Sequence, residues 1–168
     1  MEGLSFMALV MACAPLVDPG TARALVDVES AFNPNAIGVV GGALERQPRS
    51  KAQALATTRA LHEHGWNFSI GLAQINVRNL RRLNLTIDAA FDPCSNLMAM
   101  QSILEDCFER ASHNEKNPQR SLRQALSCYY SGNFVTGFRE GYVNRVVEAA
   151  KLSARLQSST FHQPKESS

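Results

Sequence analysis

The sequence lacks the cysteine and histidine spacings of a zinc site. None of its four cysteines belongs to a CxxC pair or has a histidine at zinc-finger spacing, so we expect no metal site. The even count allows two disulfides in three connectivities if the compartment is oxidising, and four buried free thiols explain it equally well. The cysteines are Cys13, Cys94, Cys107 and Cys128.

An excess of charge of either sign is also missing. The chain carries 17 basic and 15 acidic residues, a formal net charge of +2, and its Lys and Arg residues are dispersed. A nucleic-acid partner requires a concentrated basic surface, so we do not expect one.

No apolar run is long enough to cross a bilayer. The longest, from Leu4 to Val17, is too short for a membrane span, and we expect no transmembrane segment. Its length suits a signal peptide, but no basic residue precedes it and Glu2 is acidic. We therefore expect an N-terminal core helix rather than an export signal.

The 168 residues contain no internal repeat and are enough for one domain with a buried core. We expect a mainly α, single domain over residues 1–157, and a disordered tail over 158–168 that lacks periodicity. Asp18-Pro19 and Asp92-Pro93 each supply an N-cap followed by a first-turn proline. The expected helices after the first are 19–30, 51–64, 93–112, 119–131 and 140–156.

The middle of the chain is rich in loops. Residues 33–50 contain a Gly-Gly pair and two prolines and are predicted to form a loop. The stretch "WNFSIGLAQIN" begins like a short strand and crosses a glycine into a segment that could turn helical. A minimal β element is the most that this region predicts.

One acid lies on the apolar side of its helix. Ala22, Leu25 and Val26 precede Glu29 by seven, four and three positions, which places all of them on one helix face. Glu29 should therefore point inward or toward a cleft, while Asp27 should face solvent. Apolar surroundings disfavour a carboxylate, so the pKa of Glu29 should rise toward the range of a general acid. The alternative is a structural glutamate that pairs with an arginine or caps a backbone amide.

Four segments resemble a known enzyme family. "ESAFNP", "SIGLAQIN", "CYYSGN" and "GYVNRV" occur in the order found in lytic transglycosylases of the goose-lysozyme-like superfamily (SLT domain). "NAIGVVGGALERQP", "ALATTRAL" and "FDPCSNL" resemble the branch that accompanies type IV secretion and conjugation systems. The resemblance covers about residues 13–150 and implies a lysozyme-like fold.

The resemblance implies roles for individual residues. Glu29 takes the place of the single catalytic acid, with Ser30 beside it, and Tyr142 that of the late tyrosine that hydrogen-bonds the acid. Gln74 matches the cleft glutamine and Tyr129 the tyrosine of the third motif. The expected substrate-binding residues are Ser30, Ser69, Gln74, Tyr129 and Tyr142.

Substrate contacts follow from the same resemblance. Ser69 and Gln74 are expected to donate to sugar acetamido groups. The rings of Phe32, Trp66 and Tyr129 are candidates for stacking on sugar faces, although core packing is the more common role for the first two.

The chain departs from the family pattern at three positions. Tyr130 stands where many relatives have asparagine, Cys128 where they have alanine, and Gly38 where some have a serine near the acid. Contacts along the groove therefore cannot be transferred from other members as directly as the acid can.

The implied activity is cleavage of the β-1,4 bond between N-acetylmuramic acid and N-acetylglucosamine in peptidoglycan, with an anhydro-muramyl product and no cofactor. The expected partners are peptidoglycan strands and components of a type IV secretion or conjugation apparatus, and the expected location is the periplasm. The alternatives are a water-using muramidase and a non-catalytic peptidoglycan-binding assembly module.

Helix geometry limits the disulfide pairing. Cys94 and Cys107 lie thirteen residues apart in one predicted helix, which separates them by about 20 Å at about 1.5 Å per residue. They cannot bond to each other across a continuous helix, so in any disulfide each must pair with Cys13 or Cys128.

Overall fold

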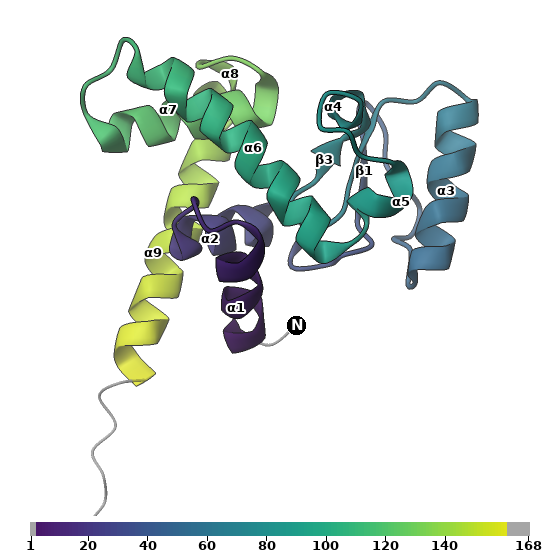
Figure 1. Cartoon of the computed structure of the whole chain (residues 1–168), viewed down its shortest axis with the longest axis horizontal. Coiled ribbons are helices and arrows are strands. Elements are labelled where there is room, and N and C mark those ends of the chain that lie inside the picture. Colours follow the sequence, from purple (N-terminus) through teal and green to yellow (C-terminus); the bar gives the residue numbers. More distant parts are fainter. Residues whose placement is uncertain (1–2, 161–168) are drawn as a thin grey trace, which may run out of the picture.

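The structure is a computed structural model that describes residues 3–160, and it is mainly helical with one small sheet (Figure 1). This confirms the predicted fold class. The long helices are α1 (Gly3–Cys13), α2 (Pro19–Ser30), α3 (Lys51–Glu63), α6 (Pro93–Ser112), α7 (Pro118–Ser131) and α9 (Tyr142–Thr160). The short ones are α4 (Val77–Leu80), α5 (Ile87–Ala90) and α8 (Thr136–Arg139), and the strands are β1 (Ile37–Val39), β2 (Phe68–Ile70) and β3 (Ile75–Asn76).

Local capping determines where the long helices begin. The side chain of Asp18 accepts a hydrogen bond from the backbone N–H of Thr21, and that of Asp92 accepts one from Ser95, both at 2.8 Å. Such caps satisfy backbone donors at a helix start, and the following proline fixes a helical φ. The predicted starts of α2 and α6 are confirmed.

The first and last helices differ from their predicted bounds. α1 ends at Cys13 rather than Val17. α9 begins at Tyr142 rather than Glu140, because Gly141 has a φ of +74° that a helix cannot include. It continues to Thr160, and the rest of the predicted tail, residues 161–168, lies outside the described residues. No helix in the described part combines the length and hydropathy needed to cross a membrane.

The sheet was only partly predicted. β1, β2 and β3 form an antiparallel meander in which Ser69 pairs with both Gly38 and Asn76. The predicted helical continuation after Gly71 is wrong: Gly71 and Gln74 have φ values of +80° and +49°, which turn the chain back into β3. The helix begins only at Val77, after its cap Asn76.

A buried asparagine holds this turn in place. Asn96 of α6 accepts from the backbone N–H of Ala73 at 2.8 Å and donates to the carbonyls of Ile70 and Ala90 at 3.0 and 2.7 Å. A Cβ on Gly71 would lie 2.2 Å from the Asn96 amide nitrogen, so only glycine fits. The turn that carries Gln74 is therefore fixed to α6 by polar contacts inside the core.

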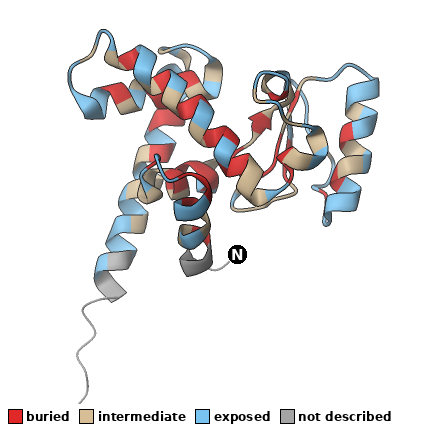
Figure 2. Ribbon diagram, viewed as in Figure 1, coloured by how far each residue is buried: buried red, intermediate tan, exposed pale blue. Residues whose placement is uncertain are grey.

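The elements form two groups on either side of α6. The sheet lies with α3, α4 and α5 on one side, and α7, α8 and α9 lie toward the other (Figure 1). Buried residues concentrate along α6, the sheet and the contact between α2 and α9 (Figure 2). A cavity between the two groups, the groove, is lined by residues that are distant in sequence, from Glu29 to Glu140.

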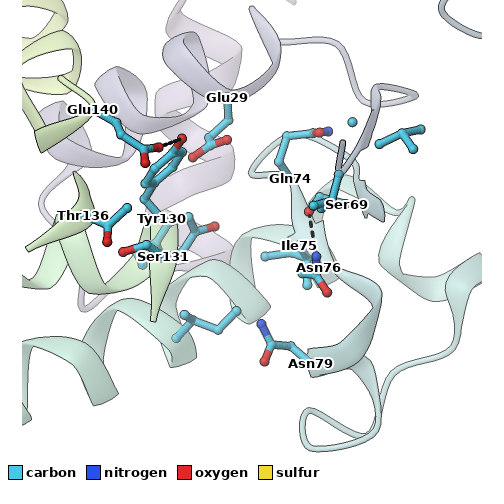
Figure 3. Close-up of a pocket in the computed structure, with 15 residues that line it drawn as sticks. Glu29, Ser69, Gln74, Ile75, Asn76, Asn79, Tyr130, Ser131, Thr136 and Glu140 are labelled. Atoms are coloured by element: carbon cyan, nitrogen blue, oxygen red, sulfur yellow. Dashed lines mark hydrogen bonds between the residues drawn. The ribbon is translucent and has the colours of Figure 1, made fainter. Parts of the chain in front are cut away.

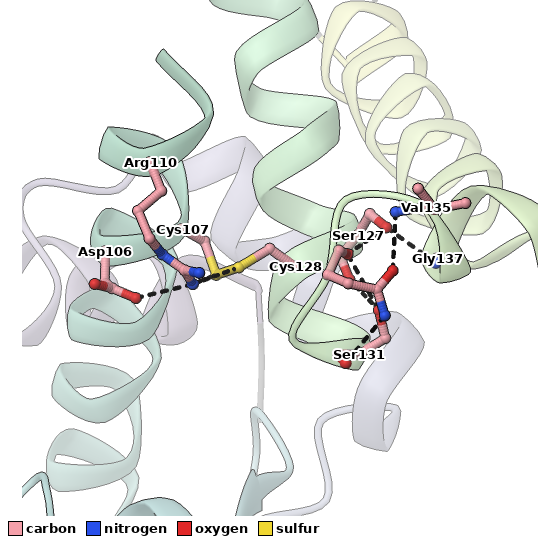
Figure 4. Close-up of a disulfide and its surroundings, with 9 residues drawn as sticks. Asp106, Cys107, Arg110, Ser127, Cys128, Ser131, Val135 and Gly137 are labelled. Atoms are coloured by element: carbon pink, nitrogen blue, oxygen red, sulfur yellow. Dashed lines mark hydrogen bonds and ion pairs between the residues drawn. A yellow bond between two sulfur atoms is a disulfide. The ribbon is translucent and has the colours of Figure 1, made fainter. Parts of the chain in front are cut away.

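Two disulfides attach neighbouring elements to α6. Cys13 at the end of α1 bonds to Cys94, and Cys107 bonds to Cys128 of α7 (Figure 4). The pairing confirms that Cys94 and Cys107 bond to other cysteines, and it decides against four free thiols. Because Cys128 directly precedes Tyr129 and Tyr130, the second disulfide fixes the part of α7 that faces the groove.

Candidate active site

The groove is a cavity of about 470 Å³ between the sheet and the α7–α8 region (Figure 3). Four of the predicted site residues line it: Glu29, Ser69, Gln74 and Tyr129. The other lining residues are Gly38, Val39, Val40, Ile75, Asn76, Asn79, Ile103, Tyr130, Ser131, Thr136 and Glu140.

Glu29 stands at the last turn of α2, with an apolar helix face behind it. Ala22, Leu25 and Val26 on that face are buried, whereas Asp27 is exposed. The predicted orientation of both acids is therefore confirmed. α2 ends at Ser30, one residue after Glu29, because its C-cap Ala31 adopts a left-handed conformation, with φ +49°.

Burial raises the pKa of Glu29 from its ordinary value of 4.5 to about 7. The removal of water disfavours the anion, and two groups act in the opposite direction: the hydroxyl of Tyr142, which donates a hydrogen bond, and the positive charge of Arg145. A carboxyl with a pKa near neutrality can both donate and accept a proton in the same reaction cycle.

Tyr142 is the polar partner of this acid. Its hydroxyl donates to Glu29 Oε1 at 2.5 Å, and its side chain is only 1% exposed, so it does not line the groove. Desolvation and the nearby Glu29 raise its pKa well above the usual value, which keeps the hydroxyl protonated as a donor. The hydroxyl contacts the acid, as the resemblance implies for the late tyrosine, and the side chain is not among those that line the groove.

Tyr130 supports Tyr142 from the groove side. The two rings are stacked, with centroids 4.5 Å apart, and the guanidinium of Arg145 lies 5.8 Å from the centroid of the Tyr142 ring. Sequence reasoning identified Tyr130 only as a departure from the family pattern, which has an asparagine there. Its aromatic ring supplies a stacking contact that an asparagine lacks.

Glu140 is a second carboxyl on the groove wall, and sequence reasoning missed it. Tyr130 donates to its Oε2 at 2.9 Å (Figure 3), and Arg139 lies 3.3 Å from its Oε1. The hydrogen bond from Tyr130 is the larger cause, and that from Arg139 the next, of a lowered pKa of Glu140. A lowered pKa favours the ionised carboxylate. One feature of the sequence could have indicated Glu140: it lies two residues before Tyr142, between the motifs "CYYSGN" and "GYVNRV".

Gln74 is oriented differently from its expected role as a donor. Its Nε2 already donates to the carbonyls of Gly71 and Ala36, at 3.0 and 3.1 Å. The oxygen Oε1 faces Gly38, where a Cβ would lie 2.6 Å from it. Gln74 therefore offers a ligand an acceptor, and the absence of a side chain at position 38 makes room for that oxygen.

Ser69 keeps a free donor at the groove. Its Oγ accepts from Asn76 Nδ2 at 3.3 Å, which leaves the hydroxyl hydrogen available to a ligand (Figure 3). Asn76 and Asn79 add side-chain amides on the same wall, and sequence reasoning did not single them out. This wall is lined by neutral polar groups.

Ser30 and Tyr129 attach other elements to the turn that carries Gln74. Ser30 Oγ donates to the carbonyl of Leu72 at 2.7 Å and does not line the groove, so its expected contact with substrate is not supported. Tyr129 Oη donates to the carbonyl of Ala73 at 2.6 Å, while its partly buried ring lines the groove. The helix α2, which carries Glu29, is thus directly connected to the turn, and so is α7.

The other two aromatic candidates lie outside the groove. Phe32 packs edge-on against the buried Phe6, with centroids 5.0 Å apart, which agrees with core packing. Trp66 is 49% exposed and lines a different cavity. Across residues 3–160, no three His, Cys, Asp or Glu side chains come together as metal ligands.

Residues 7–149 match the family described as Transglycosylase SLT domain. The chain is 47% identical over 156 residues to the type IV secretion system protein virB1 of Brucella suis biovar 1 (strain 1330), and this match covers 89% of the chain and 66% of that protein. It is 37% identical over 141 residues to protein virB1 of Agrobacterium fabrum (strain C58), with 83% and 56% covered. The chain thus spans just under two thirds of the first relative. No solved structure matches it significantly.

Proposed function

Because the chain belongs to the Transglycosylase SLT domain family, we propose that it is a peptidoglycan lytic transglycosylase with Glu29 as its single catalytic acid. The observation that carries the proposal is the environment of Glu29: a carboxyl at the groove whose pKa is about 7. The proposed substrate is the β-1,4 bond between N-acetylmuramic acid and N-acetylglucosamine.

In the first step, protonated Glu29 donates its proton to the oxygen that bridges the two sugars. The bond from this oxygen to the muramyl anomeric carbon breaks, and positive charge develops on that carbon. A neighbouring acetamido group of the sugar can stabilise this charge, as it does in substrate-assisted glycosidases. The acceptor Gln74 Oε1 and the donor Ser69 Oγ are suited to orienting such a group.

In the second step, ionised Glu29 removes the proton from a distal hydroxyl of the same muramyl residue. The hydroxyl oxygen attacks the anomeric carbon and closes an intramolecular anhydro ring, and Glu29 recovers its proton. The Tyr142 hydroxyl and the charge of Arg145 both favour the ionised state that this step requires. One carboxyl therefore serves as acid and then as base.

Glu140 is poorly suited to activate water as a second base. Its pKa is lowered by Tyr130 and Arg139, and its oxygens already accept hydrogen bonds from both. A carboxylate with a low pKa is a weak base near neutral pH. This favours the transglycosylase over the muramidase alternative, which requires an activated water.

The Brucella relative is named as a type IV secretion system protein, and this name supports a role of the chain in such a system. We propose that the chain opens the wall locally for a type IV secretion or conjugation apparatus, and that it acts in the periplasm, where peptidoglycan lies. The two disulfides agree with an oxidising compartment.

The direct test is incubation of the purified protein with peptidoglycan sacculi. We expect soluble muropeptides to accumulate at a rate proportional to enzyme concentration. Binding to sacculi without any release would favour the non-catalytic assembly module and overturn the proposal.

Replacement of Tyr142 by phenylalanine should shift the pH dependence of this activity. The hydroxyl lowers the pKa of Glu29, so its loss should raise that pKa above about 7. Cleavage requires protonated Glu29, and the alkaline limb of the pH–rate profile should therefore move to higher pH. The rate of muropeptide release, measured from pH 5 to pH 9, reports this shift.

The matched control is Tyr130→Phe. It removes the hydrogen bond to Glu140 and keeps the ring that stacks on Tyr142, so the alkaline limb should move less. If Tyr142→Phe left that limb in place or moved it to lower pH, the assigned partnership with Glu29 would be wrong.

A further inference from the structure

A second cavity, of about 490 Å³, lies beside the sheet and shares no lining residue with the groove. We call it the Trp66 pocket. It lies among the end of α3, the loop that leads into β2, α4 and α5. Its lining residues are His62, Gly65, Trp66, Asn67, Val77, Arg78, Leu80, Arg81, Leu85 and Ile87.

Trp66, the only tryptophan of the chain, contributes an aromatic surface to this pocket. It is 49% exposed, although its backbone N–H is fixed by a 2.9 Å hydrogen bond to the carbonyl of Leu61. An indole combines a large apolar face with a polar N–H. Such a face suits the C–H groups on one side of a sugar ring.

Two arginines give the pocket positive charge. Arg78 and Arg81 lie three residues apart on α4 and its C-terminal cap, a spacing that puts them on neighbouring positions of the helix surface. The lining contains no acidic residue, and neither arginine forms an ion pair within residues 3–160. A planar guanidinium binds a carboxylate through two parallel hydrogen bonds, so the charge suits a carboxylate ligand.

Asn67 also lines the pocket, but its side-chain oxygen is buried. Its Oδ1 is buried and has no hydrogen-bond partner within the described residues. Buried acceptors without partners are uncommon in folded proteins. Because this oxygen is buried, it is not presented to a ligand, and recognition by the pocket rests on the tryptophan and the two arginines.

The tryptophan and the two arginines together specify a ligand with a sugar ring and a carboxylate. We propose that the Trp66 pocket binds an acidic saccharide, namely a peptidoglycan segment whose stem peptides carry the carboxylates. The identification of the saccharide as peptidoglycan rests on the proposed function. A second contact on the same polymer would raise the effective concentration of glycan at the groove.

Fluorescence of the single tryptophan tests this binding without cleavage. The Glu29→Gln variant is titrated with purified soluble muropeptides and, separately, with a neutral N-acetylglucosamine tetramer. We expect muropeptides to change the Trp66 emission and to bind about tenfold more tightly than the neutral tetramer. The double variant Arg78→Gln/Arg81→Gln in the same background should lose this preference.

Arg46→Gln/Arg49→Gln is the matched control. It removes the same charge from a different cavity and should keep the preference for muropeptides. Unchanged Trp66 emission, or equal affinity for both saccharides, would overturn the inference. Binding of poly-glutamate but of neither saccharide would also overturn it and would identify a surface for an acidic protein segment.

The outcomes for the pocket and the groove are separable. If the wild type releases muropeptides but the Trp66 emission of Glu29→Gln does not respond to them, the proposed binding at the Trp66 pocket is wrong. The proposed function is then unaffected. A fluorescence response to muropeptides, without any release from sacculi, would support the pocket and contradict the enzyme.

Discussion

Replacement of Glu29 by glutamine should lower the rate of muropeptide release by roughly a hundred- to ten-thousand-fold, the usual contribution of a general acid. Glutamine has nearly the same shape and can still accept the hydrogen bond of Tyr142, but it cannot donate a proton to the bridging oxygen. Initial rates on sacculi, compared at equal enzyme concentration, measure the effect.

The Glu29→Gln variant should also differ from the wild type in how its stability depends on pH. The pKa of Glu29 is about 7 in the folded protein against an ordinary value of 4.5, so the folded state binds the proton more tightly than the unfolded state. The contribution of Glu29 to the stability of the wild type should therefore be lost as pH rises from about 4.5 through 7. Glutamine does not ionise, and the variant should gain in Tm relative to the wild type at pH 8 but not at pH 4.

If the Glu29→Gln variant shows this change in Tm, and is therefore folded, but still releases muropeptides at the wild-type rate, Glu29 is not the catalytic acid. Asp27→Asn is the matched control, because Asp27 lies on the same helix but is exposed. It should leave the rate nearly unchanged.

Loss of the Cys13–Cys94 disulfide should lower the free energy of unfolding by about 4.5 kcal/mol, according to the chain-entropy relation for its sequence separation of 81 residues. The same relation gives about 3.3 kcal/mol for Cys107–Cys128, whose separation is 21 residues. Paired Cys→Ser variants, compared by chemical denaturation, should show the larger loss for the first bridge.

Activity should show the opposite order. Cys128 precedes Tyr129 and Tyr130, both of which line the groove, whereas the Cys13–Cys94 bridge joins α1 to the start of α6. Under conditions where both variants are folded, loss of Cys107–Cys128 should slow muropeptide release more. Four freely alkylated thiols in protein made in an oxidising compartment would contradict both expectations.

The parts of the fold that were predicted are those that local sequence determines. The capping side chains Asp18 and Asp92 act within three residues of themselves, so the starts of α2 and α6 could be read from the chain. Strands of two or three residues have no periodicity of their own and exist through pairing, as Gly38 with Ser69 shows. For this reason the sequence predicts only a loop at residues 33–50, where the structure contains β1.

The residues of the site also fall into two classes: those whose orientation local sequence predicts, and those whose orientation depends on contacts distant in sequence. The inward orientation of Glu29 follows from the periodicity of one helix. The Nε2 of Gln74 donates to the carbonyl of Ala36, 38 residues away, so only Oε1 is available to a ligand. The sequence cannot show this contact, and it predicts a donor where the structure has an acceptor. Glu140 reaches the groove because α8 packs closely on α7: a Cβ on Gly137 would lie 2.6 Å from the Cα of Ser127 (Figure 4).

The central claim is that Glu29 serves as acid and then as base for a hydroxyl of the sugar itself. A tethered, well-oriented hydroxyl can reach an effective concentration of roughly 10⁵ M or more, far above that of water, and should therefore reach the anomeric carbon first. Mass spectrometry of the muropeptides released from sacculi measures the outcome. The products should end predominantly in anhydro-muramic acid, lighter by one water than hydrolysis products, whereas predominantly reducing-end muramic acid would contradict the claim and identify a muramidase.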